Sequence, residues 1–221
     1  MSKRVALIHT VTSLVPVFKS LCAELVPDAD IYHVVDESLL QNTIREGSLS
    51  TITTRRVLNY VISAEQGGAD AVMVTCSSIG PAVDLSQSVV SIPVLRVDGP
   101  MADYAVRGAR RIGVAATLQT TLEPTAALIK EKAKAIGKSI DLHSKLCEGA
   151  FEAVISGNAA KHDEIVSAGL RELMGKVDVI VLAQASMARV ADGFPEDERQ
   201  VPILSSPRLA VERLAEVLQT I

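Results

Sequence analysis

An internal duplication is the feature of this sequence that most constrains its fold. Three segments of the first half recur in the second half, in the same order and at offsets of 107, 108 and 109 residues. The matching segments are 4–10 with 111–117, 70–76 with 178–184, and 92–95 with 201–204. Each is a short apolar run rich in β-branched residues, which is typical of a buried strand. The repeat therefore predicts two similar domains of roughly 100 residues each.

Strand and helix patterns alternate along the whole chain. The expected strands are 4–8, 31–35, 71–75, 92–97, 111–116, 140–143, 178–183 and 201–204. Helical spacing fills the longer segments between them, for example 53–66, 101–110, 124–136 and 163–174. This pattern predicts an α/β protein of two pseudo-symmetric domains, each a mostly parallel sheet flanked by helices.

The domain boundaries follow from the same pattern. We expect a first domain at 1–98 that the C-terminal helix 208–221 completes, and a second domain at 99–207. Ligands of open α/β sheets bind at the carboxyl ends of the strands. If the two domains face each other, their strand-end loops line one shared cleft, and the two crossings between the domains permit hinge closure.

Composition and charge exclude several classes of protein. The formal charge is −4 with mixed signs, aromatic residues make up 3 % and there is no Trp, which disfavours nucleic-acid binding. No segment approaches the roughly 20 apolar residues of a membrane span. The first apolar run has five residues, too few for a signal-peptide core, and the three cysteines have no CxxC spacing. We therefore expect a cytoplasmic protein with reduced thiols. No spacing indicates a metal site, a dinucleotide site or a P-loop.

Cys76 is the side chain best placed for chemistry. It ends an apolar run and precedes Ser77 and Ser78, which are expected to begin a helix, and a helix N-terminus can favour the reactive thiolate. The alternative is a small buried residue, a common role of free cysteine. In the second half, Gln184 stands at the position of Cys76 and Thr117 at that of Thr10.

The segments VMVTCSSIG, IGVAATLQTTLEPT and VIVLAQASMA, in this order and spacing, resemble the aspartate/glutamate/hydantoin racemase superfamily over essentially the whole chain. The resemblance implies two α/β domains around a cleft, no cofactor, a small carboxylate substrate and a homo-oligomer. It also implies one cysteine from each domain, on opposite sides of the substrate's α-carbon. Cys76 matches the first cysteine, whereas Ala183-Gln184 stands where the family has glycine-cysteine. Glutamine has no titratable proton near neutral pH and cannot be the second acid or base.

Cys76 and His9 are the candidate catalytic residues. Cys76 would act as acid/base or nucleophile. His9 follows the first strand and has a suitable unperturbed pKa for the missing acid/base, but it can equally be a hydrogen-bonded structural residue. The candidate substrate-binding residues are Thr10, Ser77, Ser78, Thr117, Thr120, Gln184, Ala185 and Ser186. Their hydroxyls, amides and backbone N–H groups can hold a carboxylate, or the hydroxyls can simply cap helices.

Other polar residues have simpler interpretations. Asp36 and Glu37 are expected to cap a helix, or to contact substrate or a domain boundary. Cys22 and Cys147 are expected to be inert.

Three functions stay open. The first is a cofactor-independent racemase or isomerase that acts at a carbon next to a carboxylate through Cys76. The second is a single-cysteine decarboxylase or lyase of the same superfamily, which needs a thiol on one face only. The third is a protein that binds a small carboxylate without catalysis. The sequence does not identify the substrate.

Overall fold

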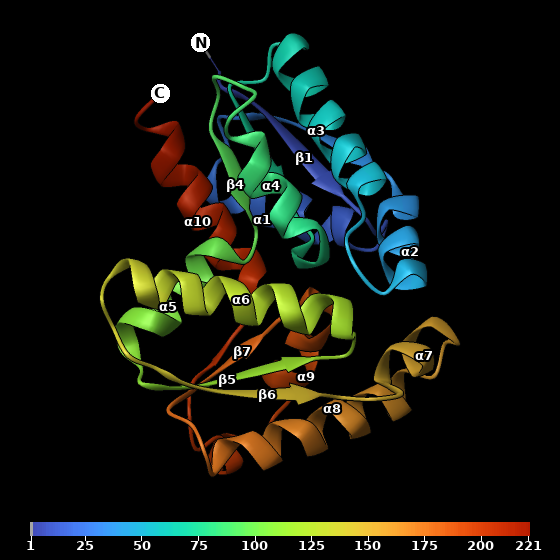
Figure 1. Cartoon of the computed structure of the whole chain (residues 1–221), viewed down its shortest axis with the longest axis vertical. Helices are drawn as coiled ribbons and strands as arrows, with labels where there is room; N and C mark the ends of the chain where they lie inside the picture. Colours follow the sequence, from blue (N-terminus) through green and yellow to red (C-terminus); the bar gives the residue numbers. More distant parts are fainter. Residues whose placement is uncertain (1) are drawn as a thin grey trace. The chain divides into compact units, whose positions relative to one another are not determined.

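A computed structural model describes residues 2–221 and divides them into two compact units. Unit 1 comprises the chain up to Pro100 together with Pro207–Ile221, and unit 2 comprises Met101–Ser206 (Figure 1). Among the described residues, no helix has the length and apolar character needed to cross a membrane.

Unit 1 is built on a four-stranded parallel sheet in the order β2-β1-β3-β4. Its elements in chain order are β1 (Arg4–His9), α1 (Leu14–Leu25), β2 (Asp30–Val35), α2 (Glu37–Glu46), α3 (Thr51–Gln66), β3 (Ala71–Val74), a 3-10 turn η1 (Ser77–Ile79), α4 (Gly80–Ser86), β4 (Val94–Arg96) and, from the end of the chain, α10 (Ser206–Leu218). The chain passes to unit 2 through α5 (Gly99–Gly108).

The central strands of unit 1 are buried on both faces, which is why they read as continuous apolar runs. Alternate side chains of β1 enter different clusters: Val5 and Leu7 pack with α1 and α10, whereas Ala6 and Ile8 pack with α2, α3 and α4. Side chains alternate between the two faces because a strand has a period of two. The residues just beyond the end of a strand therefore also point to one face or the other in turn.

Unit 2 repeats the arrangement with a parallel sheet in the order β6-β5-β7-β8. Its elements are β5 (Arg111–Ala116), α6 (Gln119–Ala135), β6 (Asp141–Leu146), α7 (Ala150–Ile155), α8 (Ala159–Met174), β7 (Val179–Leu182), η2 (Ala185–Met187), α9 (Ala188–Asp192), η3 (Glu196–Glu198) and β8 (Ile203–Leu204). Helices α6 and α8 lie on opposite faces of this sheet (Figure 1). Side chains of β7 such as Ile180 and Leu182 pack with Val166 and Leu170 of α8.

The structure confirms the predicted α/β class and its two parallel sheets, with small differences at element ends. Strand β8 has only two residues rather than the expected 201–204, although the carbonyl of Pro202 still accepts from the Ile180 N–H at 2.9 Å. Helix α6 begins at Gln119, five residues before the expected start at Pro124. Pro124 therefore lies inside the helix, where it cannot donate to the carbonyl of Thr120.

Candidate active site

The carboxyl edge of the first sheet brings together the residues that follow β1 and β3. These neighbouring strands are parallel, and the Thr75 N–H donates to the Ile8 carbonyl at 2.9 Å just beyond β3. Cys76 comes next in an extended conformation (φ −134°, ψ 117°), and the chain then turns into η1 and α4. Cys76 is half-buried against the cluster that packs on α2, α3 and α4.

Four hydrogen-bond donors lower the pKa of the Cys76 thiol. They are the Thr10 hydroxyl, the backbone N–H groups of Ser78 and Ile79, and the Ser78 hydroxyl. Burial raises the pKa of the Cys76 thiol, and these donors oppose that effect without cancelling it. The thiol is thus protonated at rest, and the anion that forms when it loses its proton already has donors around it.

His9 is fully buried and hydrogen-bonded through both ring nitrogens. Its Nδ1 lies 2.8 Å from Thr75 Oγ1, and its Nε2 lies 2.9 Å from Nδ1 of His33. The Thr75 hydroxyl donates to the Ile8 carbonyl, so we assign the Nδ1–H of His9 as donor to Thr75 and the Nε2 as acceptor from His33. Burial, and then the neighbouring His33, lower the pKa of His9 to about 4.

The side chains of His9 and Cys76 belong to opposite faces of the sheet. His9 stacks against Phe18 of α1, with ring centroids 5.6 Å apart, and Phe18 belongs to the cluster under α1 and α10. Cys76 packs with the other cluster. The proton-transfer role of His9 stays a prediction, and these contacts favour its structural alternative.

The corresponding edge of the second sheet holds Thr117 and Gln184. The Ala183 N–H donates to the Ala115 carbonyl at 2.9 Å, which is the same bond that Thr75 makes in unit 1. Gln184 has backbone angles of φ −132° and ψ 136°, close to those of Cys76, and it likewise precedes a 3-10 turn.

The side chain of Gln184 has a fixed orientation. Its Oε1 accepts from the backbone N–H of Thr117 at 2.5 Å and from the Thr117 hydroxyl at 3.0 Å. An N–H can only donate, so the atom facing it is the amide oxygen. The equivalent hydroxyl in unit 1, that of Thr10, faces the sulfur of Cys76. The two units thus supply the same hydroxyl to a thiol in one case and to an amide oxygen in the other.

The remaining predicted substrate-binding residues differ in exposure. Ser77 and Ser78 are buried, at 5 % and 2 % exposed. In unit 2, Ala185 is half-buried and Ser186 is exposed. Thr120 is half-buried, and its Oγ1 is a buried atom without a hydrogen-bond partner among residues 2–221.

Asp36 is the N-cap of α2, as the sequence predicts. Its carboxylate accepts from the Ser38 N–H at 3.1 Å and pairs with Arg56 and Tyr60 of α3. Glu37 instead accepts from the Thr12 N–H and hydroxyl, which ties the loop after β1 to α2.

The two remaining cysteines, Cys22 and Cys147, are 3 % and 2 % exposed. Burial raises the pKa of the Cys22 thiol to about 11 and also raises that of Cys147.

Sequence reasoning missed His33, Thr75, Arg96 and Asp98. His33 and Thr75 contact His9 because β2 and β3 lie on either side of β1. The order and register of these strands cannot be read from a single sequence. Arg96 and Asp98 form a buried ion pair at the end of β4. The alternation Arg-Val-Asp at the end of the predicted strand 92–97 was the available signal.

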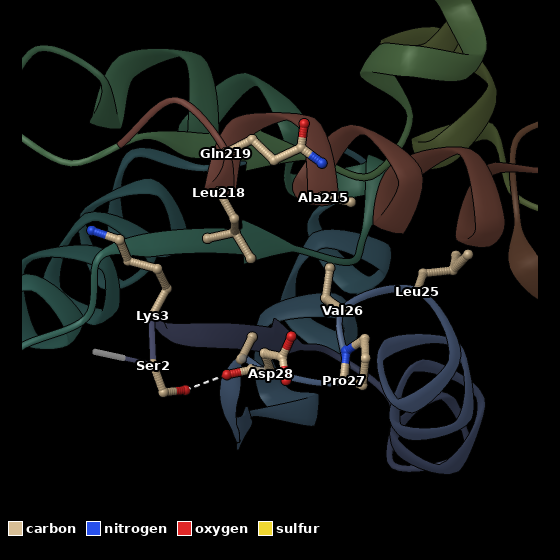
Figure 2. A pocket seen from close by; sticks show the side chains of 10 residues that line it. Ser2, Lys3, Leu25, Val26, Pro27, Asp28, Ala215, Leu218 and Gln219 are labelled. Atoms are coloured by element: carbon tan, nitrogen blue, oxygen red, sulfur yellow. Dashed lines mark hydrogen bonds between the residues drawn. The ribbon is translucent and has the colours of Figure 1, made fainter.

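A separate hollow of about 300 Å³ lies in unit 1, away from these residues. It is lined by the ends of α1 and α10 and by the residues that precede β1 and β2, including Lys3, Val26, Asp28 and Leu218 (Figure 2). It therefore opens at the amino ends of the strands, opposite the edge that holds Cys76. Among the described residues, no three His, Cys, Asp or Glu side chains form a group that could hold a metal ion.

The model of the Asp/Glu/Hydantoin racemase family matches residues 7–214. The chain belongs to this family. The match covers both units, and it makes the chain a racemase-like isomerase whose reaction is left open. A search of curated proteins gives no significant match.

Solved structures of racemases share the fold of this family member. A glutamate racemase from Bacillus anthracis is 20 % identical with a TM-score of 0.77, covering 99 % of this chain and 82 % of its own. An aspartate racemase from Picrophilus torridus is 13 % identical with a TM-score of 0.72, covering 99 % and 94 %. An allantoin racemase from Klebsiella pneumoniae is 20 % identical with a TM-score of 0.67, covering 99 % and 88 %. At such identities the likeness shows the fold and not the substrate.

Proposed function

We propose that this family member acts without a cofactor on a carbon next to a carboxylate, with Cys76 as the group that accepts and returns the proton. The observation that supports the proposal is the set of four donors around the Cys76 sulfur at the carboxyl edge of the first sheet. A thiolate that is buried away from water needs other hydrogen-bond donors around it. Donors that are already held in position take the place of water without having to reorganise during the reaction.

The proposed reaction begins when the Cys76 thiolate removes the α-proton of a small carboxylic acid. The electron pair of the C–H bond passes into an enolate-like anion, and the proton becomes part of the thiol. Hydroxyl and backbone N–H donors stabilise the charge on the carboxylate oxygens. We assign this role to Ser77 and to the second-unit residues Thr120, Gln184, Ala185 and Ser186. Thr10, Ser78 and Thr117 are proposed to line the substrate site while their donors orient Cys76 or Gln184. That both groups of residues serve one substrate in a shared cleft stays a prediction.

Gln184 favours a second candidate, chemistry on one face of the substrate. Its amide oxygen already accepts from Thr117, so the group it can offer a ligand is the Nε2–H₂ donor. That donor can hold an oxygen, but it cannot deliver a proton to the opposite face. A decarboxylation or a one-face isomerisation needs no second acid, whereas racemisation needs one.

The test is proton exchange in heavy water. The native protein and Cys76→Ala are incubated with amino acids, hydroxy acids and malonates, and proton NMR reports the α-proton signal and any new product. We expect exchange or product with the native protein and none with Cys76→Ala. The rate should rise with pH, because the pKa of the Cys76 thiol is raised and only the thiolate removes a proton.

Gln184→Cys is the variant that separates the two candidates. If the native protein exchanges its substrate with retention of configuration, Gln184→Cys should add product of the opposite configuration by supplying an acid on the second face. Native racemisation would exclude one-face chemistry. Absence of exchange, with ligand-induced thermal shifts equal in the native protein and Cys76→Ala, would instead indicate a carboxylate-binding protein without catalysis.

A further inference from the structure

A buried ion cluster lies at the carboxyl end of β4. Arg96, whose side chain is 8 % exposed, donates from Nε to Asp98 Oδ1 at 3.0 Å and from Nη2 to Asp98 Oδ2 at 2.9 Å. Asp98 is fully buried. The remaining nitrogen, Nη1, pairs with Asp84 on α4. One guanidinium therefore connects the end of β4 to α4 through two carboxylates, in a planar fork that lysine cannot reproduce.

The same guanidinium lies directly on Gly80, the first residue of α4. A methyl group on Gly80 would be 2.5 Å from Cζ and 2.8 Å from Nε of Arg96, and closer still to Nη2. Real side chains do not approach so closely, so any residue other than glycine would displace the guanidinium or the turn. A solvated arginine would move aside at little cost, but this one is held by two carboxylates. The glycine is required here by close approach and not by its backbone angles, which are helical (φ −51°, ψ −43°).

Gly80 directly follows the turn whose backbone N–H groups donate to Cys76. Residues 77–79 form η1, and the backbone N–H groups of Ser78 and Ile79 are two of the four donors to the Cys76 sulfur. A short 3-10 turn has poor hydrogen-bond geometry and little rigidity of its own. Whatever holds Gly80 in place therefore also holds the donors just before it.

We propose that Arg96 is a positioning residue that, with Asp98 and Asp84, clamps the turn 77–80 against β4 and so keeps the backbone donors aimed at Cys76. Arg96 acts through the turn and does not touch the reacting atoms. Its relevance to catalysis rests on the proposed role of Cys76, but the clamp itself can be tested without any substrate.

The measurement is the pH titration of the Cys76 thiol, followed by the Cβ chemical shift in protein labelled with ¹³C-cysteine. Cys76→Ser identifies the signal among the three cysteines. Three variants loosen the clamp in different ways. The first, Gly80→Ala, displaces the guanidinium and keeps every charge. Arg96→Lys keeps the charge beside Asp98 but loses the fork. The double variant Arg96→Met with Asp98→Asn removes one charge of each sign, so that no buried carboxylate is left unpaired.

The expected result is a Cys76 midpoint about one pH unit higher in each variant, which is a tenfold weaker acid, because two donors to the thiolate are misaligned. The matched control is Arg208→Met with Glu24→Gln, an exposed pair of unit 1 with 2.8 Å between its charged atoms. This control makes the same change of charge and should leave the midpoint unchanged. A role of Arg96 in stability alone would lower the melting temperature without moving the midpoint.

Arg96→Lys retains a cation beside Asp98 and is the variant least prone to unfold. We therefore expect at least one folded variant in which the Cys76 midpoint can be measured. If that folded variant titrates at the native midpoint, the clamp proposal is overturned. The proposed function fails separately: a shifted midpoint together with no exchange of any substrate would keep the clamp and refute the catalytic role of Cys76.

Discussion

The buried His9 should make unit 1 sensitive to acid well above the pH at which carboxylates titrate. The perturbation is a change of pH from 7.5 to 5, applied to the native protein and to His9→Gln. Burial lowers the pKa of His9 from 6.5 to about 4, so the folded protein keeps this ring neutral over a range in which the unfolded chain protonates it. Stability is therefore fully present above about pH 7 and is lost as the pH falls toward 4.

The magnitude follows from the two pKa values. Each unit of difference corresponds to about 1.4 kcal/mol, so the full loss approaches about 3 kcal/mol at pH 4 and reaches about 2 kcal/mol at pH 5. His33 contributes in the same direction, because burial lowers its pKa too, and the two hydrogen-bonded rings titrate as a pair. Such a loss is a large part of the stability of an ordinary domain.

The assay is urea unfolding at pH 7.5, 6 and 5, followed by circular dichroism. His9→Gln should lower the stability at pH 7.5 and lose most of the pH dependence between 7.5 and 5. Phe18→Leu is the matched control, because it removes packing against the same ring and leaves both histidines to titrate; it should be less stable but keep the native pH dependence. Equal pH dependence in the native protein and His9→Gln would refute the reasoning.

Three further predictions concern single contacts. Gly169→Ala should lower the melting temperature, because its methyl group would lie 2.6 Å from the sulfur of Cys147. The cost of overpacking, about 1–3 kcal/mol, outweighs the gain in helix propensity of about 1 kcal/mol. Adding Cys147→Ala should restore the melting temperature, and an unchanged melting temperature in the single variant would contradict the contact. Asp36→Ala should destabilise the fold by about 1–2 kcal/mol in urea unfolding through loss of the α2 cap, and Asp36→Asn by less; equal losses would contradict the capping role. Thr10→Val should raise the titration midpoint of Cys76 in the ¹³C experiment, since it removes one hydroxyl donor, and an unchanged midpoint would exclude that hydrogen bond.

The sequence predicts the strands and their doubling well because both depend on local apolar patterns. Buried parallel strands are continuous apolar runs, and the same runs recur about 108 residues later. Helix ends are predicted less well. Pro124 is typical of a helix start, yet α6 begins at Gln119, and the Leu122 N–H already donates to the Leu118 carbonyl at 3.0 Å before Pro124 is reached.

The site was only partly predictable, for a physical reason. Cys76 and Gln184 could be found because each ends a recognisable strand. The partners of His9 could not, because they depend on strand order and register across the sheet. Arg96 is a clearer case: its neighbour Gly80 lies on another element, and their contact depends on how α4 packs on β4.

The position of α10 has a consequence for the order in which the protein can fold. Ala210, Val211 and Leu214 of this helix are buried with Val5 and Leu7 of β1. Val5 and Val211 stand 206 positions apart, so the face of β1 that α1 covers in part lacks the rest of its cover until α10 has been synthesised. Unit 2 is a single continuous segment and can close during synthesis. Unit 1, which carries Cys76, is begun before unit 2 and completed after it, so its apolar core stays partly open while unit 2 is synthesised.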